Sequence, residues 1–246
     1  MVDEKHQGME HHALASGLGA SAAGLTLEIA WLPDQAGADE QVGTLEFRIL
    51  KAEGRPVRDF AEQHERAMHL MVVRRDLSHY QHLHPTMDHE GTWTTPLALP
   101  GPGDYRVFAD FAASGGALTL GTDLIIPGDY EPAPLPDPVG EVRIEGYEVT
   151  LDAEVTAGGG SLLTFRVSRD GCPVEDLEPY LGALGHLVAL REGDLAFLHV
   201  HPEDQAGAAG PEIAFQATFP SEGRYRLFLQ FAHAGGVRTT GFTVAV

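Results

Sequence analysis

Two stretches decide the fold: residues 68–85 read MHLMVVRRDLSHYQHLHP, and residues 185–202 read GHLVALREGDLAFLHVHP. They lie 117 residues apart, and each has a His-Leu pair near its start and a His-x-His-Pro motif at its end. In each stretch, two largely apolar runs flank a short polar turn, which is typical of a β-hairpin. The sequence therefore predicts the same histidine-bearing hairpin twice.

The repeat extends beyond the hairpins. Upstream, the same spacing of 117 residues relates Gly54, Pro56, Val57 and Asp59 to Gly171, Pro173, Val174 and Asp176. Downstream, residues 103–116 recur at 223–236, so the second copy has three more residues in the intervening loop. A repeat of this length indicates two homologous domains rather than one large one.

The division between the copies is predicted in a proline-rich connector, because residues 132–138 contain four prolines. We expect a flexible tail at residues 1–20, domains at 21–127 and 141–246, and a linker at 128–140. Alternating apolar runs such as LTLEI at residues 25–29 predict short strands in each domain. The expected fold class is all-β, with two tandem immunoglobulin-like antiparallel sandwiches of about seven strands each. Residues 59–68 have some helical spacing but are predicted to form a loop.

The composition limits the possible partners. The chain has 36 acidic and 16 basic side chains, for a formal charge of −20. An acidic surface repels phosphates, so nucleic acid is not expected as a partner, whereas cations are concentrated nearby. Plain solubility is the more common reason for such a charge, so acidity permits metal binding without proving it.

The only cysteine is Cys172, so neither an internal disulfide nor a thiolate cluster can form. Any metal site must use histidine, methionine or carboxylate. We find no apolar run long enough to span a membrane. Residues 13–27 are mostly small and follow only one basic residue, Lys5, so no signal peptide is predicted. A mature exported form and a cytoplasmic protein both remain open.

Hairpin pairing would gather three histidines on one face in each copy. With two-residue loops at residues 75–76 and 192–193, His69 pairs with His82 and has His84 as its diagonal neighbour. In the second copy, the same rule pairs His186 with His199 and puts His201 on the diagonal. Paired Cβ atoms lie roughly 4.5–5.5 Å apart and diagonal ones roughly 7–8 Å apart, so the rings can converge on a metal. Alternatively, the histidines are packing residues at strand ends.

Other residues are weaker candidates. His233 replaces Ala113 of the first copy and is a possible fourth ligand in the second. Met71 shares the predicted face of His69, although a methionine there is typical of a core. Asp110 and Gln230 are expected to orient the ligands. His6, Met9, His11 and His12 in the tail can also hold soft or borderline cations.

The two hairpins carry a family resemblance. His69-Leu70 followed by HLHP at residues 82–85, and His186-Leu187 followed by HVHP at 199–202, resemble bacterial exported YtkA-like and heavy-metal-associated proteins. The resemblance covers both copies outside the tail and the linker. It implies a β-sandwich fold, a periplasmic or secreted location and a link to metals, without fixing the metal.

Imidazole suits Zn²⁺ and Cu²⁺, and with neither thiolates nor a clear carboxylate ligand the affinity order favours copper, with zinc as second choice. The expected function is extracytoplasmic metal handling as a chaperone, buffer or resistance factor, with a metal-delivery protein as a partner. The alternative is a structural or interaction module with pH-sensitive histidines. An enzyme is not expected, because we find no nucleophile elbow, metal-hydrolase motif or phosphate loop.

Overall fold

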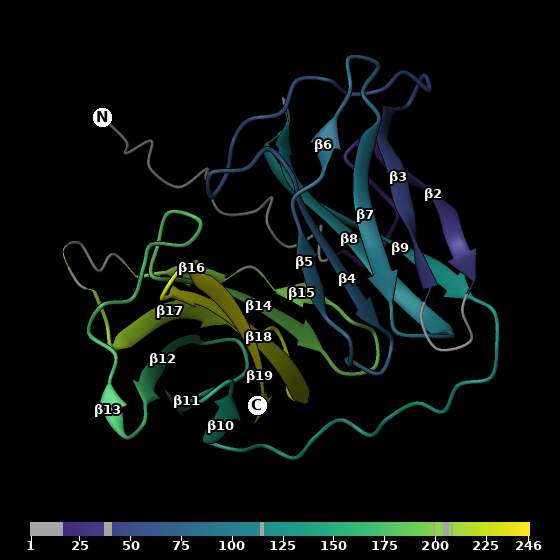
Figure 1. Cartoon of the computed structure of the whole chain (residues 1–246). Helices are drawn as coiled ribbons and strands as arrows, with labels where there is room; N and C mark the ends of the chain where they lie inside the picture. Colours follow the sequence, from purple (N-terminus) through teal and green to yellow (C-terminus); the bar gives the residue numbers. More distant parts are fainter. Residues whose placement is uncertain (1–16, 37–40, 114–115, 199, 204–206, 208) are drawn as a thin grey trace, which may run out of the picture. The chain divides into compact units, whose positions relative to one another are not determined.

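The computed structural model describes residues 17–36, 41–113, 116–198, 200–203, 207 and 209–246 (Figure 1). The chain forms two compact units, Met1–Glu131 and Pro132–Val246, and their division falls in the proline-rich stretch. The described residues form strands, turns and loops, with no helix among them. In this part of the chain no helix exists that could cross a membrane.

The first unit is a sandwich of two antiparallel sheets. One sheet has the strand order β1-β2-β3-β7-β6, and the other has the order β5-β4-β8-β9. The strands are β1 (Ser21–Ala22), β2 (Leu25–Ala36), β3 (Gln41–Lys51), β4 (His69–Arg74), β5 (Gln81–Leu83), β6 (Thr86–Met87), β7 (Trp93–Leu99), β8 (Gly103–Ala113) and β9 (Gly116–Ile126).

The second unit repeats this architecture. Its sheets have the orders β10-β11-β12-β17-β16, with β13 also paired to β12, and β15-β14-β18-β19. The strands are β10 (Glu141–Ile144), β11 (Tyr147–Ala153), β12 (Gly160–Arg169), β13 (Cys172–Pro173), β14 (Gly185–Arg191), β15 (Phe197–Leu198), β16 (Val200–Pro202), β17 (Glu212–Thr218), β18 (Arg224–His233) and β19 (Gly236–Ala245). The predicted fold class, two immunoglobulin-like sandwiches forming an internal repeat, is confirmed.

Each unit has its own apolar core between its two sheets. In β3, Leu45, Phe47 and Ile49 are buried, and the residues between them are more exposed. This alternation puts every second side chain into the core, as the pleat of a strand requires. The β4 strand differs, because all of its residues from His69 to Val73 are buried. Its Leu70 and Val72 belong to the core, whereas His69 and Met71 lie on the other face of the sheet.

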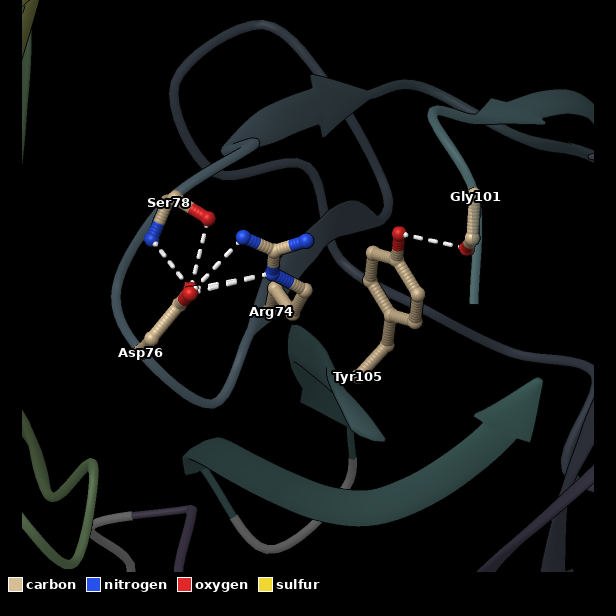
Figure 2. Close-up of polar contacts among 5 residues, drawn as sticks. All are labelled: Arg74, Asp76, Ser78, Gly101 and Tyr105. Atoms are coloured by element: carbon tan, nitrogen blue, oxygen red, sulfur yellow. Dashed lines mark hydrogen bonds and ion pairs between the residues drawn. The ribbon is translucent and has the colours of Figure 1, made fainter. Parts of the chain in front are cut away.

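A buried tyrosine fixes the corner of the first sandwich, close to the hairpin turn (Figure 2). Tyr105 donates its hydroxyl to the Gly101 carbonyl oxygen at 3.0 Å. In the turn, Asp76 accepts hydrogen bonds from the Arg74 guanidinium and from the backbone and hydroxyl of Ser78. Tyrosine corners of this kind are a hallmark of immunoglobulin-like sandwiches.

The second unit repeats both features of this corner. Tyr225 donates to the Ser221 carbonyl oxygen at 2.9 Å. In its hairpin turn, Asp194 accepts from the Arg191 guanidinium and from the Ala196 backbone. The repeat therefore preserves the polar contacts within the corner and within the hairpin turn.

The predicted register of the first hairpin is wrong by two residues. Met71, not His69, is the partner of His82, and continuing this register puts His69 across from His84. The cause lies in the turn, where Arg74 N bonds to Ser78 O and both Leu77 and His79 have positive φ, so the loop holds more than two residues. A shift of two residues keeps every side chain on its face. The three histidines therefore still share one face.

The second hairpin is also shifted by two residues, and its outer strand is divided. Ala189 pairs with Leu198, because the loop between Arg191 and Ala196 has four residues instead of two. After β15 the chain leaves β14, and β16 pairs with β17 in the other sheet. The predicted continuous pairing through His201 is therefore wrong.

Candidate metal site

Three histidines converge on the face of the β5-β4-β8-β9 sheet that points away from the core. Each of His69, His82 and His84 offers a ring nitrogen, and the three nitrogens lie within 4.8 Å of one another. The ring centroids are 5.1 Å apart for His69 and His82, 5.2 Å for His69 and His84, and 4.8 Å for His82 and His84. Rings bound tetrahedrally to one ion through nitrogens at about 2.0–2.1 Å have centroids roughly 5 Å apart. The rings thus already have the spacing of a shared ligand set.

His69 is the fixed member of this cluster. Its side chain is 1% exposed, and its Nε2 donates to the Gln63 carbonyl oxygen at 2.9 Å. A proton on Nε2 leaves the lone pair of the neutral ring on Nδ1, which lies 3.0 Å from His82 Nε2. A backbone carbonyl that sets the tautomer in this way is a common partner of metal-binding histidines.

His84 supplies the clearest chemical signal. Its Nε2 is buried and has no hydrogen-bond partner among the described residues. Burial lowers the pKa of His84 to about 4, and the nearby His69 and Arg66 act in the same direction. Burial also lowers the pKa of His69, partly opposed by its hydrogen bond to the Gln63 carbonyl. Both rings are therefore neutral at neutral pH, which is the state that binds metals.

Two further side chains border the cluster. Met71 pairs with His82 across the hairpin and is 1% exposed, and it lies on the histidine face because it is two residues from His69. Asp110 is the partner of His69 on the neighbouring strand β8. Its carboxylate accepts a hydrogen bond from Thr119 at 2.7 Å and opposes the lowering of the His69 pKa. A thioether and a carboxylate thus lie beside the three imidazoles on the same face of the sheet.

The second copy holds a different arrangement. His186 pairs with Gln230 on β18, as His69 pairs with Asp110 in the first copy. His201 is exposed on β16 and pairs with Gln216. His199 lies outside the described residues, so the predicted convergence of His186, His199 and His201 stays a prediction. Among the described residues, the one group of three or more metal-binding side chains is that of the first copy.

His233 is not brought to His186. Because Gln230 pairs with His186, and His233 lies three residues further along β18, strand alternation puts His233 on the opposite face of the sheet. There its Nδ1 bonds to the Tyr147 hydroxyl at 2.7 Å, and its Nε2 bonds to Asp176 at 3.0 Å. Both ring nitrogens are thus engaged within the second sandwich, which argues against the fourth-ligand prediction.

A fourth histidine lies near the cluster and was not predicted as a ligand. His64 is exposed, and its ring centroid is 6.0 Å from that of His69. It lies in the turn between Gln63 and Arg66, within residues 59–68, which form loop and isolated bridges rather than a helix. One feature of the sequence could have pointed to His64: the first copy has His64-Glu65 where the second copy has Leu181-Gly182.

Fold and site together define a tandem β-sandwich protein with a three-histidine cluster on one sheet face. A family model, "Domain of unknown function (DUF8832)", matches residues 21–126 and 141–246. The chain therefore belongs to this family and carries two copies of its domain. No curated protein matches the chain.

Solved structures similar to the chain include three of different origin. A conserved domain protein from Bacillus anthracis is 7% identical, with a TM-score of 0.31, and the match covers 98% of this chain and 93% of that one. The S-layer protein rSbsC(31-844) is 11% identical, with a TM-score of 0.26, over 89% of this chain and 27% of that one. Titin I-band fragment I67-I69 is 9% identical, with a TM-score of 0.22, over 92% and 66%. The chain thus spans about a quarter of the S-layer fragment. Likenesses this distant say nothing about function.

Proposed function

We propose that this protein binds a transition-metal ion through His69, His82 and His84 and acts in metal handling outside the cytoplasm. In this role it serves as a chaperone, buffer or resistance factor that exchanges its ion with a metal-delivery protein. The periplasmic or secreted location is part of the proposal and follows from the resemblance to YtkA-like proteins. Catalysis is not part of it.

One observation carries the proposal: His84 Nε2 is buried without a hydrogen-bond partner among the described residues, and His84 belongs to the group of three histidines whose ring nitrogens lie close together. Leaving a buried polar atom without a hydrogen bond costs free energy, so such an atom in a folded protein calls for an explanation. A metal ion provides one, because it would take up the His84 lone pair together with those of His69 and His82.

Copper is the first choice and zinc the second. All three nitrogens belong to imidazoles, and copper binds such donors more tightly than zinc does. Met71 next to His82 adds a thioether, which favours Cu(I). Zinc fits a tetrahedral site of histidines equally well in geometry, so the choice of ion depends on affinity.

The test is metal analysis and titration of the purified chain without an affinity tag. Because His6, His11 and His12 in the tail can bind metal weakly, the parent for all titrations is a variant with these three histidines replaced by Ala. We expect it to bind Cu(II) or Zn(II) tightly, and His82→Ala/His84→Ala to lose about one equivalent without loss of fold by circular dichroism. No tight binding by the parent, or unchanged stoichiometry in the double variant, would refute the site.

The second copy offers a matched comparison. If His186, His199 and His201 form an independent site, His199→Ala/His201→Ala will remove a second equivalent. If the first copy alone binds metal, this variant will bind as the parent does.

The other candidate function is a structural or interaction module. It is favoured by the second copy, where His233 is engaged by Tyr147 and Asp176 in a network that needs no ion. This function predicts no stoichiometric metal in either copy, so the same titration decides between the two.

A further inference from the structure

We propose that His64 is the fourth ligand of the metal site, an inference that rests on the metal-binding function proposed above. Residues 63–66 form a tight turn closed by two backbone hydrogen bonds, from Gln63 N to Arg66 O at 2.8 Å and from Arg66 N to Gln63 O at 3.0 Å. The two central residues, His64 and Glu65, have φ values of 48° and 64°. Two successive positive φ angles between paired ends define a type I′ turn.

The residues in this turn do not match its conformation. Type I′ turns strongly prefer Asn-Gly and similar pairs, because side chains with a Cβ are strained at positive φ. The second copy has the same turn, closed between Tyr180 and Ala183, with Leu181 and Gly182 at the centre. Glycine thus relieves the second position there, whereas the first copy keeps Glu65. Backbone strain is therefore retained at Glu65, directly beside His64, and residues strained in this way cluster at functional sites.

The turn is fixed directly to the histidine cluster. Gln63, which opens the turn, accepts the hydrogen bond from His69 Nε2, so the residue next to His64 orients the first ligand. The His64 ring centroid is 6.0 Å from that of His69, about 1 Å beyond the spacing of rings that share one ion. The exposed His64 side chain is not in the group of nitrogens within 4.8 Å, so binding the ion would require it to rotate about its side-chain bonds.

The coordination chemistry favours such a residue. Three histidines leave one position of a four-coordinate ion open, and sites that hold a metal without catalysis usually fill all four positions with protein ligands. Met71 and Asp110 are the neighbouring alternatives. Met71 is buried, and Asp110 is half-buried and accepts a hydrogen bond from Thr119. His64 is the solvent-exposed donor, so it can leave the ion without disturbing the fold, which suits a protein that passes its metal to a partner.

The experiment compares His64→Asn with His89→Asn in the parent that lacks the tail histidines. His89 is a matched control, because it is also an exposed turn histidine of the first domain, with its side chain 92% exposed. Cu(II) and Zn(II) are titrated against a competing chelator, and the nitrogens bound to Cu(II) are counted by electron paramagnetic resonance. We expect His64→Asn to keep one equivalent, bind it at least tenfold more weakly and show one nitrogen fewer, with His89→Asn unchanged.

A second measurement tests the strain itself. Because Asn-Gly is the preferred pair for this turn, His64→Asn/Glu65→Gly should raise the melting temperature of the metal-free protein while it weakens metal binding. The same affinity and nitrogen count in His64→Asn as in the parent would overturn this inference and leave the metal-binding function intact. A parent that binds no metal would overturn both. A lower melting temperature of the metal-free double variant would overturn the strain argument on which the inference depends.

Discussion

Acidification will destabilise the metal-free first domain through His84. Burial holds the pKa of His84 in the folded protein at about 4, against 6.5 for the free side chain. Between these values the unfolded chain binds a proton and the folded chain does not, so the proton favours unfolding. The contribution of neutral His84 to stability is therefore fully present above about pH 6.5 and is lost as the pH falls towards 4.

The structure sets an upper limit to this effect. The difference between 6.5 and about 4 corresponds to at most about 3.4 kcal/mol. Because the His84 side chain is only partly buried, solvent screens the cost of charging it, and we expect roughly 1–2 kcal/mol. The buried His69, whose pKa is lowered by the same cause, will add to the loss in the same direction.

The assay is urea unfolding with EDTA at several pH values between 7.5 and 4, for the native chain and for His84→Gln. Subtracting the two profiles removes the contribution of the many carboxylates, which are common to both. The native chain should lose about 1–2 kcal/mol more than His84→Gln over this range. Parallel profiles, or a smaller loss in the native chain, would show that His84 is not held neutral by burial.

Two further predictions compare the copies with each other. Tyr105→Phe should lower the free energy of unfolding, measured in urea, by about 1–2 kcal/mol, because it leaves the buried Gly101 carbonyl without its hydrogen-bond donor. Tyr225→Phe should cost less, since its hydrogen bond is only partly buried, and equal losses would contradict this reasoning. Gly121→Ala should lower the free energy of unfolding by roughly 1–3 kcal/mol, because the new Cβ would collide with the backbone oxygen of Gly17. Gly241→Ala, the matching change in the second copy, should lower it less, because the new Cβ would meet the end of a flexible arginine side chain. Equal melting temperatures for the two alanine variants would refute the second comparison.

Much of the fold follows from the sequence, because it depends on patterns that are local or repeated. The spacing of 117 residues between the hairpins indicated two homologous domains, and the alternating apolar runs indicated strands. The common face of His69, His82 and His84 was also predictable. It survived a register error of two residues, because the side chains of a strand alternate with a period of two.

Turn conformation and chain path were not predictable in this way. The positive φ of Leu77 and His79, which lengthens the first loop, has no glycine to announce it. His201 leaves the hairpin for the other sheet because pairing with β17 replaces pairing with β14, a choice between strands far apart in sequence. The strand period therefore places the three histidines of the first copy on one face, but it does not by itself place His201 of the second copy.

The sequence by itself thus determined the repeat, the sandwich class and the face on which the first three histidines lie. Only the tertiary structure decided that His84 Nε2 is buried without a hydrogen-bond partner among the described residues, and that Gln63 fixes the His69 tautomer. It also decided that the ring centroids of His64 and His69 are 6.0 Å apart. The physical reason is range: strand periodicity acts between neighbours along the chain, whereas burial and hydrogen bonding at the site arise where the turn at residues 63–66, the hairpin and strand β8 pack together.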